Sequence, residues 1–404
     1  MQTQQSARSG LAGEARVSGW DRRGLPAWAY SNPELMELEQ DLLFRRHWQL
    51  ACHVGDIPNT GDYVTFDVCG ERALILRDRD GSVRAFHNLC RHRGSRLLSG
   101  QQGHCKNALV CPFHGWVFNF DGSLRGVAHP ESLPALDKQA WGLKPVEMEI
   151  WQGFIFVRFK PGPQPSVASL LKPYEAEAAA FRSAEAQPTY GAWGMESPVN
   201  WKSVRDIDNE GYHVPMAHPG LHDLYGKHYN DEPFQNGISR SRGRFNESNG
   251  ERWSVRHYRA ILPEVSWLDP QYRSQWIYHS LFPNTVITFK PDGVSFYQEF
   301  PIGQRRSQLR GRCYGLPDDR REMRLARYLS SRIDRDTGVE DVNLTIWSDE
   351  ATQSSAYDGI ILSDLERTVR SHHDALRAFF PVLNLEKAPA AGTLAERNAE
   401  MLAG

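Results

Sequence analysis

Two short motifs that each pair a cysteine with a histidine carry the strongest chemical signal in the sequence. Cys90 and His92 stand in Cys-Arg-His, and Cys111 and His114 stand in Cys-Pro-Phe-His. Two thiolates and two imidazoles on two short loops can converge on zinc or on an iron–sulfur cluster. A structural zinc finger usually keeps both cysteines in one pair and both histidines in the other. The mixed pairs therefore favour a two-iron cluster in which one iron takes both sulfurs and the other both nitrogens.

Length and composition exclude several classes of protein. A chain of 404 residues predicts two domains. The 47 Lys and Arg balance 49 Asp and Glu without a basic stripe, so nucleic acid is not an expected partner. The polar start and the lack of a run of about eighteen apolar residues predict a cytoplasmic protein with no membrane partner. The sequence also lacks a Gly-x-Gly-x-x-Gly fingerprint, so electrons from a dinucleotide would need a separate reductase.

The order of sequence patterns predicts an α+β fold. Residues 33–48 have apolar positions at helical spacing, and residues 48–159 alternate in short runs broken by Gly and Pro. The proline-rich segment 161–165 marks a domain boundary, after which strands are followed by helices. Ser363 and Glu366 form a capping box ahead of one of these helices, and the residues after Lys387 are expected to be a polar surface tail.

A second candidate metal site lies in residues 200–221, where His213 and His218 follow three acids, Asp206, Asp208 and Glu210. Two histidines and one carboxylate form the facial triad that binds Fe(II) and leaves positions open for O₂. On a straight helix the two histidines would point about 140° apart. Pro215 and Pro219 give the chain reasons to bend.

Both sites together resemble the Rieske oxygenase family. The matching segments are Cys-Arg-His-Arg-Gly, Cys-Pro-Phe-His-Gly-Trp, the Asn-Trp-Lys block that leads to Tyr-His-Val-Pro-Met-Ala-His, and the C-terminal stretch from Ser354 to Glu366. The resemblance covers nearly the whole chain. It implies a small antiparallel β Rieske domain and a helix-grip-like catalytic domain with an antiparallel sheet and C-terminal helices. The expected domains are an N-terminal helical segment packing on the catalytic domain (1–47), the Rieske domain (48–160) and the catalytic domain (161–404).

The resemblance also assigns residues. Cys90, His92, Cys111 and His114 would hold a [2Fe-2S] Rieske cluster, and His213 and His218 would bind a mononuclear Fe(II). The third ligand of the family lies in a downstream acid pair, which here is Glu340-Asp341, and the register selects Asp341 over Glu340. Glu210 matches the acid that links the mononuclear site to a Rieske histidine of a neighbouring subunit. The roles of Asp206 and Asp208 stay open, because Ile207 stands where many members have Asn.

The resemblance implies a terminal oxygenase alpha subunit that works as a homotrimer, sometimes with small partner subunits. It would use O₂ and electrons from NAD(P)H through a separate reductase, with or without a ferredoxin. The segment around Tyr212 and His213 is closer to members that oxidise quaternary ammonium compounds, so N-demethylation or hydroxylation of such a compound is favoured over hydroxylation, dihydroxylation or O-demethylation of an aromatic one. A soluble Rieske electron carrier or sensor is the alternative of another class. Candidates for an aromatic cage around a cation in an apolar cavity are Trp193, Trp253, Tyr258, Trp267, Trp276, Tyr278, Phe282 and Trp347.

Overall fold

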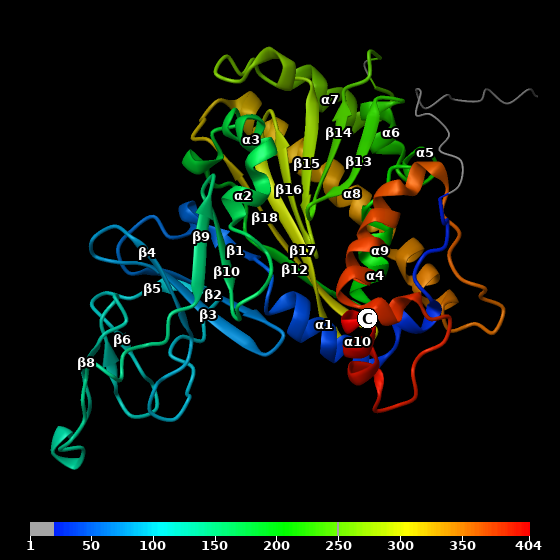
Figure 1. The fold of residues 1–404 in the computed structure, drawn as a ribbon. Helices are drawn as coiled ribbons and strands as arrows, with labels where there is room; N and C mark the ends of the chain where they lie inside the picture. Colours follow the sequence, from blue (N-terminus) through cyan, green and yellow to red (C-terminus); the bar gives the residue numbers. More distant parts are fainter. Residues whose placement is uncertain (1–19, 249) are drawn as a thin grey trace, which may run out of the picture. The chain divides into compact units, whose positions relative to one another are not determined.

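The computed structural model describes residues 20–248 and 250–404 and divides the chain into two units. The small unit comprises residues 37–191 and 314–316. The large unit comprises residues 192–313 and 317–404 together with the N-terminal residues up to Met36. Figure 1 labels the elements of both units.

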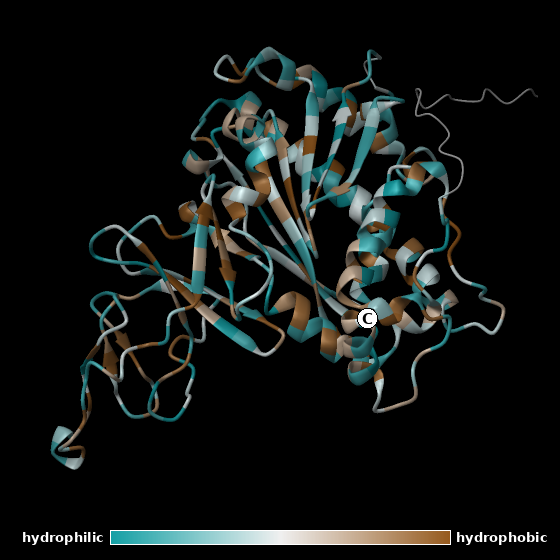
Figure 2. Ribbon diagram, in the orientation of Figure 1, coloured by the Kyte–Doolittle hydropathy of each residue, from teal (hydrophilic) through white to brown (hydrophobic). Residues whose placement is uncertain are grey.

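The small unit is built from short antiparallel strands. Three sheets have the strand orders β1-β10-β9, β4-β3-β2-β5 and β6-β7-β8. Their bounds are β1 (Gln49–His53), β2 (Asp62–Val68), β3 (Glu71–Arg77), β4 (Val83–His87), β5 (Gln102–His104), β6 (Leu109–Val110), β7 (Val117–Phe118), β8 (Leu124–Gly126), β9 (Glu147–Trp151) and β10 (Phe154–Arg158). Strand β10 is hydrophobic through most of its length, in keeping with its burial between β1 and β9 (Figure 2).

Short helices complete the small unit. They are the π-helix η2 (Gln40–Phe44), which continues α1 (Pro33–Glu39), then η3 (Val54–Asp56), η4 (Pro130–Ser132), α2 (Val167–Leu171), η5 (Lys172–Tyr174), α3 (Glu175–Ala179) and η6 (Ser183–Glu185). A two-residue strand, β11 (Gln187–Pro188), pairs with Tyr314 and Gly315.

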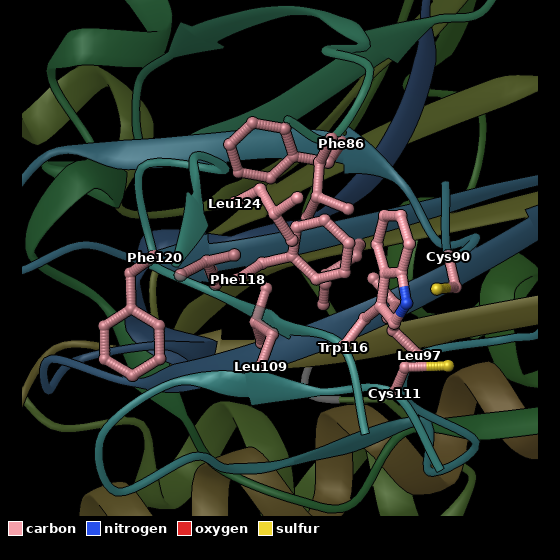
Figure 3. Packing of buried hydrophobic residues seen from close by; sticks show 12 residues of the cluster. Phe86, Cys90, Leu97, Leu109, Cys111, Trp116, Phe118, Phe120 and Leu124 are labelled. Carbon is pink, nitrogen blue, oxygen red and sulfur yellow. The ribbon is translucent and has the colours of Figure 1, made fainter. Parts of the chain in front are cut away.

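A hydrophobic core supports the two Cys/His loops of the small unit. Cys90 and Cys111 lie together at one end of this cluster beside the Trp116 indole (Figure 3). Its other buried members are Leu74, Leu76, Phe86, Leu97, Leu109, Phe118, Phe120, Leu124 and Leu143. Packing from two sheets, β4-β3-β2-β5 and β6-β7-β8, therefore fixes the bases of both loops.

The large unit is an antiparallel meander with helices before it, between two of its strands and after it. Its strand order is β18-β17-β16-β15-β14-β13, and β12 also pairs with β18. The strands are β12 (Trp193–Ser197), β13 (Tyr229–Gln235), β14 (Ile238–Arg244), β15 (Gln275–Leu281), β16 (Thr285–Lys290), β17 (Gly293–Gly303) and β18 (Arg306–Gly315). The helices are η1 (Ala27–Tyr30), α4 (Trp201–Asp208), α5 (Val214–Ala217), α6 (Pro219–Tyr225), α7 (Trp253–Ile261), η7 (Pro270–Tyr272), α8 (Arg321–Ala351), η8 (Asp364–Glu366), α9 (Arg367–Phe379), η9 (Pro381–Asn384) and α10 (Leu394–Ala403).

The units do not coincide with the expected domain boundaries. Residues 161–191 belong to the small unit, because the Val167 N–H donates to Glu149 and the Ser183 hydroxyl donates to the Gln152 carbonyl. Residues 20–36 belong to the large unit, and residues 37–47 do not. The part of the expected N-terminal segment before residue 20 lies outside the described residues. The three-part functional division therefore stays a prediction.

The C-terminal region agrees with the sequence in one place and differs in another. The capping box is present, because the Ser363 hydroxyl accepts from the Leu365 N–H and Glu366 accepts from the Ser363 N–H. The expected surface tail instead contains α10, which buries Leu394 and Asn398. Within residues 20–248 and 250–404, no helix has both the length and the apolar character needed to cross a bilayer.

Asp349, near the end of α8, ties that helix to the start of α4. Its fully buried carboxylate accepts from the Asn200 N–H at 2.9 Å, the Ser203 hydroxyl at 2.7 Å and Arg305 Nε at 2.7 Å. Replacing it removes an acceptor from three donors and leaves a guanidinium without its carboxylate partner. We expect Asp349→Ala to lower the free energy of unfolding by about 3 kcal/mol, measured by denaturant titration. Glu350→Ala, at the exposed neighbouring position, should change it by less than about 0.5 kcal/mol. Equal effects of the two substitutions would contradict this role.

Candidate metal centres

The two Cys/His loops have the same backbone hydrogen bonds. The N–H of each cysteine donates to the carbonyl five residues later, Ser95 for Cys90 and Trp116 for Cys111. The glycine four residues after each cysteine donates back to the cysteine carbonyl, and both glycines have positive φ. Such a tight turn favours glycine, since a side chain is strained there. The sequence repeats Cys and Gly at this spacing because both loops need the same turn.

The loops bury their thiols and expose their imidazoles. Cys90 and Cys111 are 1% and 2% exposed and are not disulfide-bonded, whereas His92 and His114 are exposed. The two imidazole centroids lie 4.7 Å apart, and the His92 ring stacks on Trp116 at 5.1 Å. Burial, with a further contribution from the nearby Cys111, raises the pKa of Cys90 to about 11. A metal must therefore displace the thiol proton to bind there.

The arrangement fits a two-iron cluster better than a single zinc ion. Zinc at about 2.3 Å from sulfur and about 2.0 Å from nitrogen would draw all four ligand atoms into one tight group. Among residues 20–248 and 250–404, one such group of three or more metal-ligating atoms occurs, and it does not include these loops. The sulfurs lie together on the buried side and the rings lie together on the exposed side, as separate irons require.

That compact group is the second centre, formed by His213, His218 and Asp341. The helical path of the chain is interrupted in the segment where the prolines predict a bend. Helix α4 ends at Asp208, His213 precedes α5, and His218 separates α5 from α6 with φ −119° and ψ 77°. The break turns the two rings toward each other. Asp341 comes from the middle of α8, far along the chain.

The three ligand atoms converge without a hydrogen bond to the carboxylate oxygen. The two Nε2 atoms lie 2.9 Å apart, and Asp341 Oδ1 lies 3.0 Å from His218 Nε2 and 3.7 Å from His213 Nε2. Asp341 Oδ1 is buried and has no hydrogen-bond partner in the described part of the chain. A buried oxygen aimed at two ring nitrogens fits the donor set of a 2-His-1-carboxylate iron site.

A second carboxylate orients each imidazole. Glu210 accepts from His213 Nδ1 and from the backbone N–H groups of Tyr212 and His213, and Glu340 accepts from His218 Nδ1 at 3.0 Å. Because a carboxylate only accepts, both Nδ1 atoms carry the proton and both Nε2 lone pairs face the metal position. Burial alone would lower the pKa of His218, but Asp341 and Glu340 outweigh it and raise the pKa.

The two acids left open by the sequence support the fold of α4. Asp206 accepts from the Tyr30 hydroxyl at 2.5 Å and from His373 Nε2 at 2.7 Å. Asp208 accepts from the buried Arg205 at 2.5 Å and from the Tyr297 hydroxyl at 2.7 Å. Neither carboxylate belongs to the group of metal-ligating atoms.

Comparison with known families agrees with both centres. Residues 47–137 match the Rieske [2Fe-2S] domain, and residues 185–381 match the catalytic domain of the ring hydroxylating alpha subunit. The chain therefore has both domains of a Rieske non-heme iron oxygenase. These domains imply a Rieske cluster and a mononuclear iron.

Similar proteins include oxygenases of both substrate classes. The carnitine monooxygenase oxygenase subunit of Escherichia coli K12 is 34% identical over 200 residues, which are 49% of this chain and 53% of that protein. The large oxygenase component of the naphthalene 1,2-dioxygenase system of Pseudomonas aeruginosa is 34% identical over 199 residues, 47% of this chain and 43% of that protein. The matched part thus spans about half of each relative.

A solved structure extends the likeness to most of the fold. The quaternary ammonium Rieske monooxygenase CntA, crystallised with an inhibitor, has a TM-score of 0.74 and 23% identity, covering 88% of this chain and 94% of CntA. This likeness confirms the predicted α+β fold of a Rieske oxygenase.

The structure brings together the residues predicted as ligands of each centre, and it places Glu340 against one of the ligand rings. The sequence distinguishes Glu340 from Asp341 only as the acid that does not bind the metal. It does not predict the contact of Glu340 with His218. The two acids are adjacent on α8, where successive side chains point about 100° apart. One can therefore face the metal position while the other meets the outer nitrogen of a ligand ring.

Iron binding provides a test that separates these two acids. We expect Asp341→Ala to lose the mononuclear iron while the Rieske cluster keeps its visible spectrum. Glu340→Gln should keep the site but weaken its iron affinity by about 10- to 100-fold, because a neutral amide supports the His218 ring less well. Competition with a chelator measures both. Glu350→Gln on the same helix is the matched control. Unchanged affinity in Glu340→Gln would contradict the orienting role.

Proposed function

We propose that this chain is the terminal oxygenase component of a Rieske system that oxidises an N-methyl group of a small quaternary ammonium compound. The observation that carries the proposal is the convergence of His213, His218 and Asp341 in a chain that also has a Rieske domain. When bound, the cluster supplies single electrons and the mononuclear iron binds O₂. Oxidation of an N-methyl group gives a hemiaminal, which releases formaldehyde.

The residues of this chain have separate tasks in the proposed reaction. Cys90, Cys111, His92 and His114 hold the cluster, and the facial triad holds the iron and leaves positions open. Glu210 and Glu340 keep both imidazoles in the tautomer that binds metal. The chain would receive electrons from NAD(P)H through a separate reductase, with or without a ferredoxin. Because that reductant is cytoplasmic, a cytoplasmic location belongs to the same proposal.

Two alternatives are distinguishable. Oxidation of an aromatic compound is supported by the naphthalene dioxygenase relative, whose identity equals that of the carnitine relative. The carnitine relative, together with the segment from Glu210 to Pro215, supports the quaternary ammonium class. A Rieske electron carrier or sensor would have no use for the triad.

The proposed working unit is a homotrimer in which the cluster of one chain serves the iron of the next. Each centre lies beside exposed apolar side chains, which an interface between copies would cover. Val110 and Phe113 are 52% and 54% exposed at the cluster loops. Beside the triad, Tyr212, Met216 and Val339 are 52%, 89% and 66% exposed.

Substrate class can be read from coupled products. With a suitable reductase, we expect O₂ uptake together with formaldehyde release on carnitine- and betaine-type compounds, because only N-methyl oxidation yields formaldehyde from them. Benzoates should give little uptake. In single turnovers with chemically reduced protein, Asp341→Ala should form no product, whereas Glu350→Ala should match the unsubstituted enzyme. Fast O₂ uptake with benzoates and none with the quaternary ammonium compounds would contradict the proposal and favour an aromatic substrate. Product formation by Asp341→Ala would indicate that the oxygen-activating iron site lies elsewhere in the chain.

Mixed oligomers test the electron path between subunits. His114→Ala should lack the cluster, and Asp341→Ala should lack the iron, so each is expected to be inactive alone. If transfer runs head to tail around a ring of three, a mixed trimer purified through two affinity tags has one productive contact. Its activity should recover to roughly one third of that of the unsubstituted enzyme. Mixed trimers without activity would contradict transfer between chains.

A further inference from the structure

A row of polar side chains crosses the sheet of the large unit. Asp231 of β13 lies opposite Ser241 of β14, which lies opposite Tyr278 of β15. The row continues to Thr288 of β16 and Ser295 of β17. Residues that lie directly opposite each other in an antiparallel sheet point to the same face. We call these five residues the polar row.

The polar row faces the helices that hold the triad. The Tyr278 hydroxyl bonds to the Tyr225 hydroxyl of α6 at 2.8 Å. Positions two residues from the row share its face. Among them Tyr297 bonds to Asp208 of α4, and Lys290 pairs with Asp334 of α8. His213 and His218 lie between α4 and α6, and Asp341 is on α8. The side of the sheet that faces the triad helices therefore carries a row of hydroxyls and one carboxylate.

Asp231 is the member of the row nearest to the histidine loop. A Cβ placed on Gly211 would collide with the Tyr229 ring and lie 3.3 Å from Asp231 Oδ2. Gly211 stands two residues before His213 and directly after Glu210. Glycine is thus required where this loop passes Tyr229, and the Asp231 carboxylate is adjacent to it.

Asp231 differs from the other carboxylates on this face because it has no cationic partner in the described part of the chain. Asp208 pairs with Arg205, and Asp334 pairs with Lys290. Asp231 Oδ1 is buried without a hydrogen bond. Burial, reinforced by the negative charge of Glu210, raises the pKa of Asp231 to about 7, although Ser241 and Tyr229 act in the opposite direction. A positive charge beside this carboxylate would be favourable.

Aromatic rings lie beside the same carboxylate. Tyr229 stacks on Tyr225 with ring centroids 5.9 Å apart, and the charge of Asp231 acts on both Tyr229 and Tyr278. Ring faces attract a cation that has lost part of its hydration.

The eight candidates for an aromatic cage mostly lie elsewhere. Trp193, Trp253, Trp267 and Trp347 are exposed, and Tyr258, Trp276 and Phe282 are buried. Tyr278 and Tyr229 pack against the same cluster as Tyr258 and Trp276 but are only half-buried. The Trp276 face is already covered by the Lys290 ammonium at 3.9 Å from the ring centroid.

We propose that Asp231, with the rings of Tyr229 and Tyr278, binds the cationic group of the substrate. This inference rests on the proposed function and assigns its specificity to named residues. The carboxylate attracts the charge, and the rings contact the methyl groups that an ammonium cannot use for hydrogen bonds. Ser241 supports Asp231 and Tyr229, and the hydroxyls of Thr288 and Ser295 remain for the polar end of the substrate.

Equilibrium binding to the oxidised, metal-loaded enzyme tests this subsite without turnover. Choline carries the quaternary charge, and 3,3-dimethylbutan-1-ol is its neutral analogue with carbon in place of nitrogen. We expect the unsubstituted enzyme to bind choline at least tenfold more tightly than the alcohol in calorimetry. Asp231→Asn, which keeps the size of the side chain, should lose about tenfold in choline affinity and leave alcohol binding unchanged. Asp231→Glu should restore part of the preference.

Glu232→Gln is the matched control, because Glu232 is the next residue on β13, points to the opposite face and pairs with Arg240. It should bind choline as the unsubstituted enzyme does. Equal choline affinity in Asp231→Asn and Glu232→Gln would overturn the inference about Asp231, while formaldehyde release would still report on the proposed function. An unsubstituted enzyme that does not distinguish choline from the alcohol would overturn the inference as well. If the unsubstituted enzyme prefers choline to the alcohol but releases no formaldehyde, the demethylation proposal alone is rejected. The visible spectrum of the cluster verifies that each variant is folded.

Discussion

The catalytic centre depends on bringing two imidazole nitrogens of one short segment to the same point. His213 and His218 would diverge on a continuous helix, and the break at His218 turns them until their Nε2 atoms lie 2.9 Å apart. This arrangement holds because Glu210 and Glu340 fix the outer nitrogens. The rest of the large unit serves the same geometry. Helix α8 carries both Glu340 and Asp341, and Asp349 near its end ties this helix to the start of α4.

Most of the residues predicted as ligands have a local signature in the sequence. The Cys and His of each loop lie within four residues of one another, and Pro215 and Pro219, two residues and one residue after the two catalytic histidines, mark the bend. The third ligand has no local signature, and only the register of a longer resemblance selects Asp341. The contact between Glu340 and His218 spans 122 residues, so no spacing within one motif reveals it. The small compact unit extends to Gly191, past the proline-rich segment, because prolines end a strand without ending the packing of the helices that follow.

The aromatic residues show where composition misleads. Tryptophans attract attention as cage candidates because they bind cations best, yet a large ring is most easily accommodated in a core or at a surface. Trp276 does contact a cation, but the cation is Lys290 of the same chain. The rings left to face the triad helices are tyrosines, whose hydroxyls bond to each other and to carboxylates. The strand register places these tyrosines. The five residues of the polar row come from five separate strands, and no local sequence pattern links them before the strands pair.

Burial at the two centres constrains how the copies could meet. The cluster loops keep their sulfurs inside and their imidazoles outside, so another protein can approach the ring edges but not the thiolates. Glu210 is 9% exposed, and its oxygens already accept from His213 Nδ1 and from two backbone N–H groups. A neighbouring histidine could use only the remaining lone pairs of that carboxylate. The same acid that fixes the tautomer of a ligand would then set the point of contact, so a substitution at Glu210 would disturb iron binding and subunit coupling together.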